Sequence, residues 1–242
     1  MRTVNVGRVR LGPKPVKTLV SLEGATPKAL CEKARELDSE PVDILEWRVD
    51  SFRNRTVPAL KKTLSKLREA TGKPLLVTVR TCREGGKADL SRQDYKNLLI
   101  ELLAEIAPDA LDVEFGRGDI ASLVAAAHEK KVPVIASFHD FSKTPSESAL
   151  LKKLARMENG GADVLKIAVM PKTPSDVLRL LKVLLVACKT LKSPIVAIAM
   201  GQLGTLTRIA GGQLGSCATF AGFGKVSAPG QLDLHETIRF LS

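Results

Sequence analysis

Aromatic residues are scarce in this sequence of 242 residues, making up 4% of it with one Trp and one Tyr. Proteins that bind single-stranded nucleic acid stack bases on aromatic side chains placed among basic ones. The chain is basic, with a formal net charge of +11, but no basic stretch contains interleaved aromatic residues. Its basic residues fall in helical patterns such as Lys61, Lys62, Lys66 and Arg68, which indicates solvated helix faces. We therefore expect no nucleic-acid partner.

Cysteine is also rare, and the four cysteines, Cys31, Cys82, Cys188 and Cys217, form no CxxC pair and no metal-ligand spacing. This pattern predicts reduced thiols and a cytoplasmic protein. Long apolar runs are missing as well. No segment reaches the length of a membrane span without a charge, and residues 1–12 contain no signal-peptide core. We therefore expect no membrane partner.

Strand and helix signals alternate along the chain after an opening segment rich in Val, Arg and Gly. Short apolar runs are followed by amphipathic patterns, some with clear caps, such as Thr26 before Pro27. The predicted strands cover residues 16–21, 42–48, 75–80, 110–115, 133–138, 163–170, 194–200 and 218–222. The predicted helices cover residues 27–38, a segment that begins at 57, and residues 91–106, 120–130, 146–159, 174–191, 205–211 and 232–241.

This alternation predicts an α/β fold, namely a single (β/α)8 TIM barrel with an N-terminal extension, formed by one domain over residues 1–242. An open doubly wound sheet is the alternative, but it usually carries a glycine fingerprint after its first strand, and SLEGATP at 21–27 is not one. In a parallel barrel, reactive residues come from the carboxyl ends of the strands and the loops that follow. The polar residues at those positions are therefore the candidate site.

A lysine stands in the middle of the apolar run ADVLKIAVM at 162–170. The run has strand length and predicts a strand buried on both faces. An unpaired buried ammonium is so unfavourable that the group tends to lose its proton, and a neutral amine attacks carbonyl groups. Lys166 is therefore a candidate Schiff-base nucleophile. The alternative is a lysine that is paired with an acid, or one whose stem packs while its head reaches water.

One of the three histidines, His139, directly follows a predicted barrel strand, whereas His128 and His235 fall in predicted helices. Imidazole is the side chain best matched to proton transfer near neutral pH. His139 is therefore the natural general acid and base for a lysine on the neighbouring strand. The alternative is a structural histidine that Asp140 holds by a hydrogen bond.

Charged residues also end two earlier strands. Glu46 and Arg48 are two residues apart and point to the same side of their strand, either as a binding pair or as a salt bridge lining the barrel mouth. Arg80 ends the next predicted strand, and Glu84 lies in the turn after it. Each is an ordinary loop charge when taken alone, but their joint position at the reactive end of a barrel favours a role in the site.

The loops after the last two strands add further polar groups. Arg208 is the only charge in the Gly-rich stretch 201–216. It could bind a phosphate together with that stretch, or it could present a planar fork to a carboxylate. Ser227 and Gln231 flank a Pro-Gly pair, which fits either a lid over a polar ligand or an ordinary turn.

Six stretches of the chain together resemble sequences of the type I 3-dehydroquinate dehydratase family. The members of this family are Schiff-base enzymes of the shikimate pathway. The stretches are EWRVD at 46–50, TVRTCREGG at 78–86, SFHDFSKTP at 137–145, ADVLKIAVMP at 162–171, GSCATFAG at 215–222 and SAPGQL at 227–232. The resemblance implies dehydration of 3-dehydroquinate to 3-dehydroshikimate without a metal or organic cofactor. It also implies that Lys166 forms the imine, that His139 transfers protons, and that Glu84 orients the imidazole.

The same resemblance implies a homodimer and a set of substrate-binding residues: Ser21, Glu46, Arg48, Arg80, Arg208, Ser227 and Gln231. Two other functions stay open from the residues alone. One is a barrel aldolase that acts on phosphorylated sugars through a lysine imine and binds phosphate at the Gly-rich stretch. The other is a basic binding protein whose barrel only displays charge.

Overall fold

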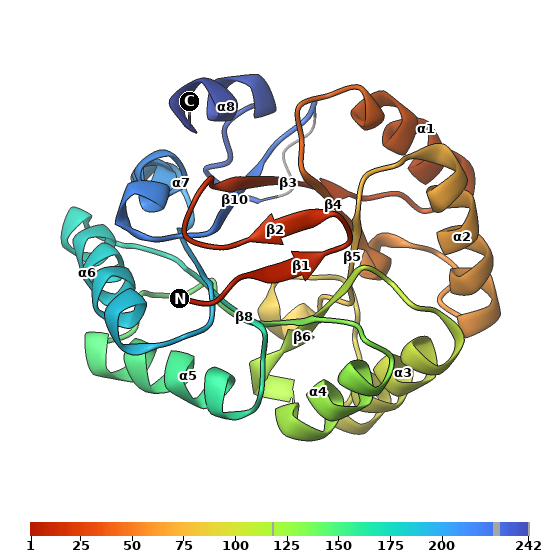
Figure 1. Cartoon of the computed structure of the whole chain (residues 1–242), viewed down its shortest axis with the longest axis horizontal. Coiled ribbons are helices and arrows are strands. Elements are labelled where there is room, and N and C mark those ends of the chain that lie inside the picture. The colour runs from red at the N-terminus through yellow and green to blue at the C-terminus, as the bar shows by residue number, and fades with distance from the viewer. Residues whose placement is uncertain (118, 225–227, 242) are drawn as a thin grey trace.

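The computed structural model describes residues 1–117, 119–224 and 228–241. Eight parallel strands form one sheet in the order β10-β3-β4-β5-β6-β7-β8-β9. They are β3 (Lys17–Leu22), β4 (Ile44–Arg48), β5 (Leu75–Thr78), β6 (Ala110–Glu114), β7 (Val134–Asp140), β8 (Val164–Val169), β9 (Ile195–Ala199) and β10 (Ala218–Ala221). The helices are α1 (Pro27–Asp38), α2 (Val57–Ala70), α3 (Arg92–Glu105), α4 (Ile120–Glu129), α5 (Glu147–Asn159), α6 (Pro174–Thr190), α7 (Thr205–Ala210) and α8 (Leu234–Leu241). Figure 1 shows them as a ring around the strands.

The two edges of the sheet meet near the start of β10. There the backbone N–H of Cys217 donates to the carbonyl of Ile195 at 2.8 Å, and Ile195 also forms a parallel bridge with Ser216. The predicted (β/α)8 barrel is thus confirmed, and all four cysteines are free, as predicted. No helix in the described ranges is long and apolar enough to cross a membrane.

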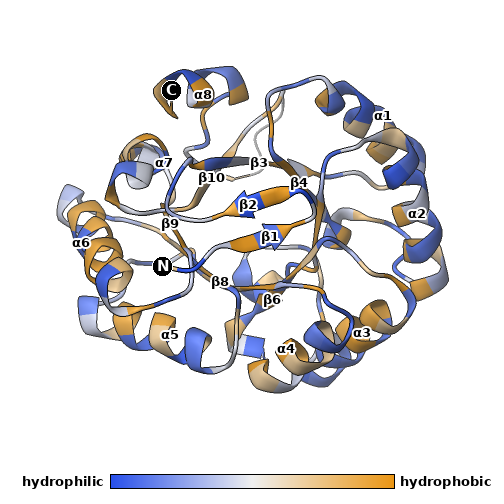
Figure 2. Ribbon diagram, viewed as in Figure 1, coloured by the Kyte–Doolittle hydropathy of each residue, from blue (hydrophilic) through white to orange (hydrophobic). Residues whose placement is uncertain are grey.

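Most predicted elements begin and end within two residues of the observed ones, because capping residues mark the helices. Thr26 accepts a hydrogen bond from the backbone of Ala29 at the start of α1, and Thr173 and Asp176 form a capping box at the start of α6. Figure 2 shows polar and apolar residues interspersed along the helices, as expected of helices that cover a sheet on one side and face solvent on the other.

One predicted boundary is wrong in a way that matters for the site. The prediction ends the fifth barrel strand at residue 138, but β7 continues to Asp140, so His139 lies within the strand and not after it. The reason is the long neighbouring strand, because His139 pairs with Ala168 and Asp140 with Val169 of β8.

Side chains along β8 alternate between the inside and the outside of the barrel. Leu165 and Ile167 belong to the apolar cluster between the sheet and the helices, whereas Val164 and Ala168 belong to the cluster inside the barrel. Lys166 lies between these two inward residues and therefore points inward as well.

The N-terminal extension forms a hairpin that the sequence did not predict, made of β1 (Val4–Val6) and β2 (Val9–Leu11). In Figure 1 it crosses the centre of the ring of helices. Val4, Val6 and Leu11 join the cluster inside the barrel. Burial of each such side chain stabilises the folded state by about 1.5–3 kcal/mol. The hairpin therefore closes the amino end of the barrel with apolar contacts that also stabilise the fold.

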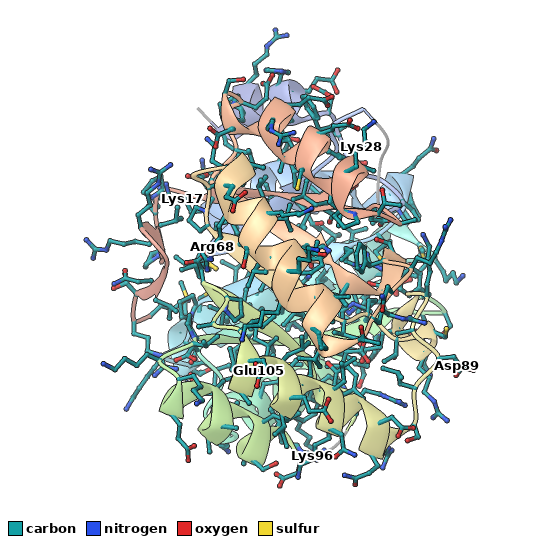
Figure 3. All side chains as sticks on the ribbon, turned by 90° about the vertical axis from the view of Figure 1, so that its right-hand side faces the viewer. Lys17, Lys28, Arg68, Asp89, Lys96 and Glu105 are labelled. Atoms are coloured by element: carbon teal, nitrogen blue, oxygen red, sulfur yellow. The ribbon has the colours of Figure 1, made fainter. Side chains whose placement is uncertain are left out.

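Figure 3 shows the barrel from the side. Lys17, at the start of β3, lies on the left with the hairpin, and Asp89, in the loop that follows β5, lies on the right. The strands therefore run from the closed amino end on the left to the loops on the right, and any pocket at the carboxyl ends opens on that side.

Candidate active site

A pocket of about 240 Å³ lies at the carboxyl ends of the barrel strands. Every predicted site residue that the structure describes lines it: Ser21, Glu46, Arg48, Arg80, Glu84, His139, Lys166, Arg208 and Gln231. Ser227, the remaining predicted residue, lies outside the described ranges. The pocket thus gathers side chains from positions that are up to 210 residues apart in the sequence (231 − 21).

Lys166 occupies the floor of this pocket, and its side chain is 5% exposed. Its Nζ lies 3.7 Å from Oε1 of Glu46, 3.8 Å from Oδ2 of Asp112 and 4.0 Å from the centre of the Phe220 ring. The amine is therefore flanked by two carboxylates at distances longer than a normal hydrogen bond. The lysine does not extend to solvent, so that alternative is wrong.

Burial lowers the pKa of Lys166 from its ordinary value, and the positive charges of Arg80 and Arg48 lower it further. The carboxylates of Glu46 and Asp112 oppose this effect. The net lowering of the pKa increases the fraction of neutral amine, which is the nucleophilic form.

Glu46 is held in place from two sides. The hydroxyl of Ser21 donates to its Oε2 at 2.6 Å, and the hydroxyl of Thr78 donates to its Oε1 at 3.0 Å. Burial alone would raise the pKa of Glu46, but Lys166, Arg48 and the Ser21 hydrogen bond outweigh it and lower the pKa to about 2. Glu46 is therefore a fixed negative charge beside the amine.

His139 contacts Glu84 through both its ring and its backbone. Nδ1 lies 2.9 Å from Oε2 of Glu84, and the backbone N–H donates to the same oxygen at 3.1 Å. The alternative partner, Asp140, instead accepts hydrogen bonds from Ser142 and from the backbone of Lys143 in the turn after β7. The interpretation of His139 as a residue held by Asp140 is therefore wrong.

The environment of this pair sets its protonation. Burial raises the pKa of Glu84 to about 8, and Glu114 and Asp112 add to the rise while Arg80 opposes it. Burial also lowers the pKa of His139 well below its ordinary value, helped by Arg80. Near neutral pH these pKa shifts favour a protonated Glu84 and an uncharged imidazole. One proton then lies between Oε2 of Glu84 and Nδ1 of His139.

Arg80 lies at the centre of a buried polar network. Its Nη2 donates to Asp112 at 2.9 Å, and its Nη1 donates to Ser137 at 2.9 Å, to Glu114 at 3.2 Å and to Glu84 at 3.4 Å. Asp112 and Glu114 are site residues that were not predicted from the sequence. The signal that could have found them is LDVE at 111–114, where two acids alternate in a buried strand and so share one face.

The alternative of a salt bridge between Arg48 and Glu46 is wrong, because Arg48 forms its ion pairs in the described structure with other acids. Its Nε and Nη2 bind Asp50 at 2.8 Å each, and its Nη1 lies 3.6 Å from Glu23. The reason is that Asp50, two residues further on, offers both carboxylate oxygens to the planar guanidinium. Arg48 and Glu46 both face the pocket, but as separate groups.

Arg208 connects three segments of the pocket wall. Nη1 donates to the carbonyl of Phe220 and Nη2 to the carbonyl of Pro229, both at 3.2 Å. Pro229 also accepts from the backbone N–H of Gly201 at 3.1 Å. Burial lowers the pKa of Arg208 to about 10, and its Nε has no hydrogen-bond partner in the described chain.

Gly230 explains how the loop 228–231 approaches so closely. Its φ is +76°, and a Cβ at this position would lie 2.2 Å from the carbonyl oxygen of Gly201. Only glycine fits both demands. Gln231, the next residue, is thereby directed to the pocket, and its side-chain oxygen accepts from the backbone of Ala228 at 3.2 Å.

Apolar residues complete the pocket wall and were also missed by the sequence analysis: Phe141, Ala168, Ile198, Met200 and Phe220. Apolar residues at strand ends look the same in sequence whether they face a core or a ligand, so no signal distinguished them. Among the described residues there is no cluster of three or more His, Cys, Asp or Glu that could hold a metal ion.

A parallel barrel with a buried lysine and a histidine in one pocket at the carboxyl ends of its strands is typical of enzymes that bind keto substrates as imines. The chain belongs to the type I 3-dehydroquinase family, whose model matches residues 18–242. Family membership decides against a barrel aldolase and against a basic protein that only displays charge.

Relatives in sequence and in structure agree with this assignment. The chain is 40% identical to 3-dehydroquinate dehydratase of Lactiplantibacillus plantarum over 96% of its own length and 93% of the relative. It is 37% identical to catabolic 3-dehydroquinate dehydratase of Acinetobacter baylyi, over 99% and 90% of the two chains. The solved type I 3-dehydroquinate dehydratase of Clostridium difficile superposes with a TM-score of 0.94 at 38% identity, covering 99% of this chain and 96% of that one.

Proposed function

We propose that this chain dehydrates 3-dehydroquinate to 3-dehydroshikimate through an imine on Lys166, as a hydro-lyase of the shikimate pathway. The family match over residues 18–242 and the names of the relatives support the reaction and its substrate. The observation that supports the mechanism is the buried Nζ of Lys166, whose pKa is lowered, at the floor of a pocket that His139 also lines.

The proposed reaction begins with attack by the neutral amine. The nitrogen lone pair of Lys166 forms a bond to the ketone carbon, and the π pair of the C=O bond moves to oxygen. This oxygen takes one proton from the amine and one from the Glu84–His139 pair and leaves as water, so a protonated imine remains. His139 then removes a proton from the adjacent carbon, the C–H electron pair forms a C=C bond to the imine carbon, and the π pair of the C=N bond moves to nitrogen to give an enamine.

The enamine then expels the hydroxyl group from the next carbon. His139 returns its proton to that oxygen, so the group leaves as water, and the electrons of the enamine restore the imine beside the new C=C bond. Water hydrolyses this conjugated imine to release 3-dehydroshikimate and free Lys166. In this scheme Glu84 orients the imidazole and shares its proton, in keeping with the 2.9 Å contact to Nδ1.

The remaining predicted residues are proposed to bind substrate. Arg208 would grip the carboxylate with its planar guanidinium. Glu46, Arg48 and Arg80 would contact hydroxyl groups, and Ser21, Gln231 and Ser227 would complete the polar contacts. The position of all but Ser227 on the pocket wall supports these roles.

The decisive test is mass spectrometry of the protein after incubation with 3-dehydroquinate and borohydride. We expect a mass gain equal to that of a reduced substrate or product imine, located on the peptide that contains Lys166. A Lys166→Ala variant is the control and should gain no mass. If the wild-type protein turns over substrate but no adduct forms on Lys166, the imine route is wrong.

We further propose a single catalytic domain over residues 1–242 that acts in the cytoplasm as a homodimer. One domain is supported by the single eight-stranded barrel, whose amino end the β1–β2 hairpin closes. A reducing compartment is supported by the free cysteines. The dimer is supported by exposed apolar side chains on α6, Leu178, Leu185 and Val186. Size-exclusion chromatography with light scattering tests it, and a mass of 26.0 kDa in solution would contradict it.

A further inference from the structure

Asp112 holds an unusual position beside the reactive amine. It is fully buried, and its Oδ1 accepts hydrogen bonds from Nη2 of Arg80 at 2.9 Å and from the hydroxyl of Ser137 at 2.7 Å. Its Oδ2 has no hydrogen-bond partner among the described residues and lies 3.8 Å from Nζ of Lys166. A buried acceptor without a partner is unfavourable, and more so when it is charged, so this oxygen calls for an explanation.

The second carboxylate beside the amine does not share this feature. Glu46 also lies close to Nζ, at 3.7 Å, but both of its oxygens accept hydrogen bonds, from Ser21 at 2.6 Å and from Thr78 at 3.0 Å. Of the two carboxylates that flank the amine, only Asp112 has an oxygen that accepts no hydrogen bond from the described residues.

We propose that Asp112 is the counterion of the protonated imine on Lys166, and that its Oδ2 accepts the hydrogen bond of the imine N–H. This inference rests on the proposed function, because it assigns a partner to the intermediate of that reaction. A protonated imine carries one N–H and one positive charge, and Oδ2 offers one free acceptor and a negative charge at the right place.

The arrangement fits the electronic demand of the reaction. The imine withdraws electrons from the adjacent C–H bond only while it is protonated, and a nearby anion favours the protonated form. The hydrogen bonds from Arg80 and Ser137 to Oδ1 stop the carboxylate from turning away, so Oδ2 is in place before the positive charge develops. Such a preorganised group stabilises developing charge without having to reorient.

Glu114 provides a matched control for this role. It is also buried and also pairs with Arg80, at 3.2 Å, but its oxygens accept from the backbone and the hydroxyl of Thr81 at 2.7 Å each. It forms no described ion pair with Lys166. Glu114→Gln therefore disturbs the Arg80 network by the same chemical change as Asp112→Asn, but without removing the charge that faces Nζ.

The test compares Asp112→Asn with Glu114→Gln in two measurements on the full chain. The first is the pH dependence of Lys166 acetylation by acetic anhydride without substrate, read by peptide mass spectrometry. The second is turnover of 3-dehydroquinate. Because Asp112 raises the pKa of Lys166, we expect Asp112→Asn to shift acetylation to lower pH while turnover falls by about ten- to a hundredfold. Glu114→Gln should leave the pH dependence of acetylation unchanged.

This split separates a counterion from a structural residue, since misfolding would expose Lys166, remove the effect of burial on its pKa and move the acetylation profile to higher pH instead of lower. Unchanged turnover in Asp112→Asn would overturn the proposal, and so would lost turnover with the acetylation profile of the wild type. The outcome is independent of the adduct experiment on the wild-type protein, which tests the imine itself.

A second measurement covers the case in which Asp112→Asn does not fold. A crystal structure of the borohydride-reduced adduct of the wild-type protein contains a secondary ammonium, which stands in for the protonated imine. We expect its nitrogen within about 3.2 Å of Oδ2 of Asp112. A hydrogen bond to Glu46 or to water in place of Asp112 would overturn the proposal.

Discussion

Nδ1 of His139 lies 2.9 Å from Oε2 of Glu84, and the backbone N–H of His139 donates to the same oxygen at 3.1 Å. One carboxylate oxygen therefore fixes both the ring and the end of the strand that carries it. Because burial raises the pKa of Glu84 to about 8 and lowers that of His139, the two residues act as one acid–base unit.

This unit predicts the effect of Glu84→Gln on the pH profile. In the wild-type protein the pair must lose its shared proton before the imidazole can act as a base, so activity should rise as pH approaches the Glu84 pKa of about 8. Glutamine does not titrate, and the pKa of the remaining His139 is held low by burial and by Arg80. The acidic limb of kcat/KM should therefore move to lower pH, and a limb at the wild-type position would contradict the shared proton.

Replacing His139 by Ala should lower kcat by about 10²–10⁴-fold, the usual contribution of general acid–base catalysis. Lys166 remains, so a borohydride-trapped adduct should still form in this variant. Stopped-flow turnover and mass spectrometry on the same sample measure both effects. Turnover at the wild-type rate would remove His139 from the mechanism.

Lys166→Ala and Lys166→Arg should both be inactive. Arginine keeps the positive charge but its guanidinium stays protonated and does not act as a nucleophile. If charge alone were required, the arginine variant would retain activity. A coupled assay of 3-dehydroshikimate formation distinguishes the two cases, with circular dichroism to confirm that both variants fold.

Arg208→Lys should raise KM for 3-dehydroquinate by about tenfold or more, because lysine lacks the planar fork that binds a carboxylate through two hydrogen bonds. The same change removes a donor to the carbonyl of Phe220 or Pro229. Inorganic phosphate should not compete with substrate in the wild-type protein. Strong competition by phosphate would instead favour a phosphate site at the Gly-rich stretch.

Leu11→Ala in the hairpin should lower the free energy of unfolding by about 2–5 kcal/mol, since it opens a cavity inside the barrel. Urea denaturation measures this loss, and Arg10→Ala, an exposed neighbour in β2, is the control that should change stability little. If Leu11→Ala is as stable as the control, the hairpin does not contribute to the barrel core.

Local pattern was enough to predict the barrel and its lysine. Lys166 is visible because a charge interrupts an apolar run, and α1 and α6 are visible because Thr26 and Thr173 precede prolines. The hairpin was not predictable in the same way, because β1 and β2 have only three residues each. Their valines and leucine are buried by contacts with the barrel interior, which a local sequence pattern does not reveal.

The polar network was the least predictable part of the site. Arg80 contacts Asp112 and Glu114, which are 32 and 34 residues away, and Glu84 contacts His139, which is 55 residues away. Pairings of this kind depend on the closure of the barrel and leave no local pattern in the sequence. The association of Glu84 with His139 was expected only because the chain resembles a known family.

The hairpin across the amino end also affects how substrate and water enter and leave the pocket. Because Val6 and Leu11 fill that end, the pocket of the described chain is a blind chamber whose mouth lies among the loops after the strands. Substrate, product and the water set free by the elimination pass through this mouth. A water molecule that has not yet departed is then at hand to hydrolyse the imine, so the leaving group of one step can become the reagent of the last.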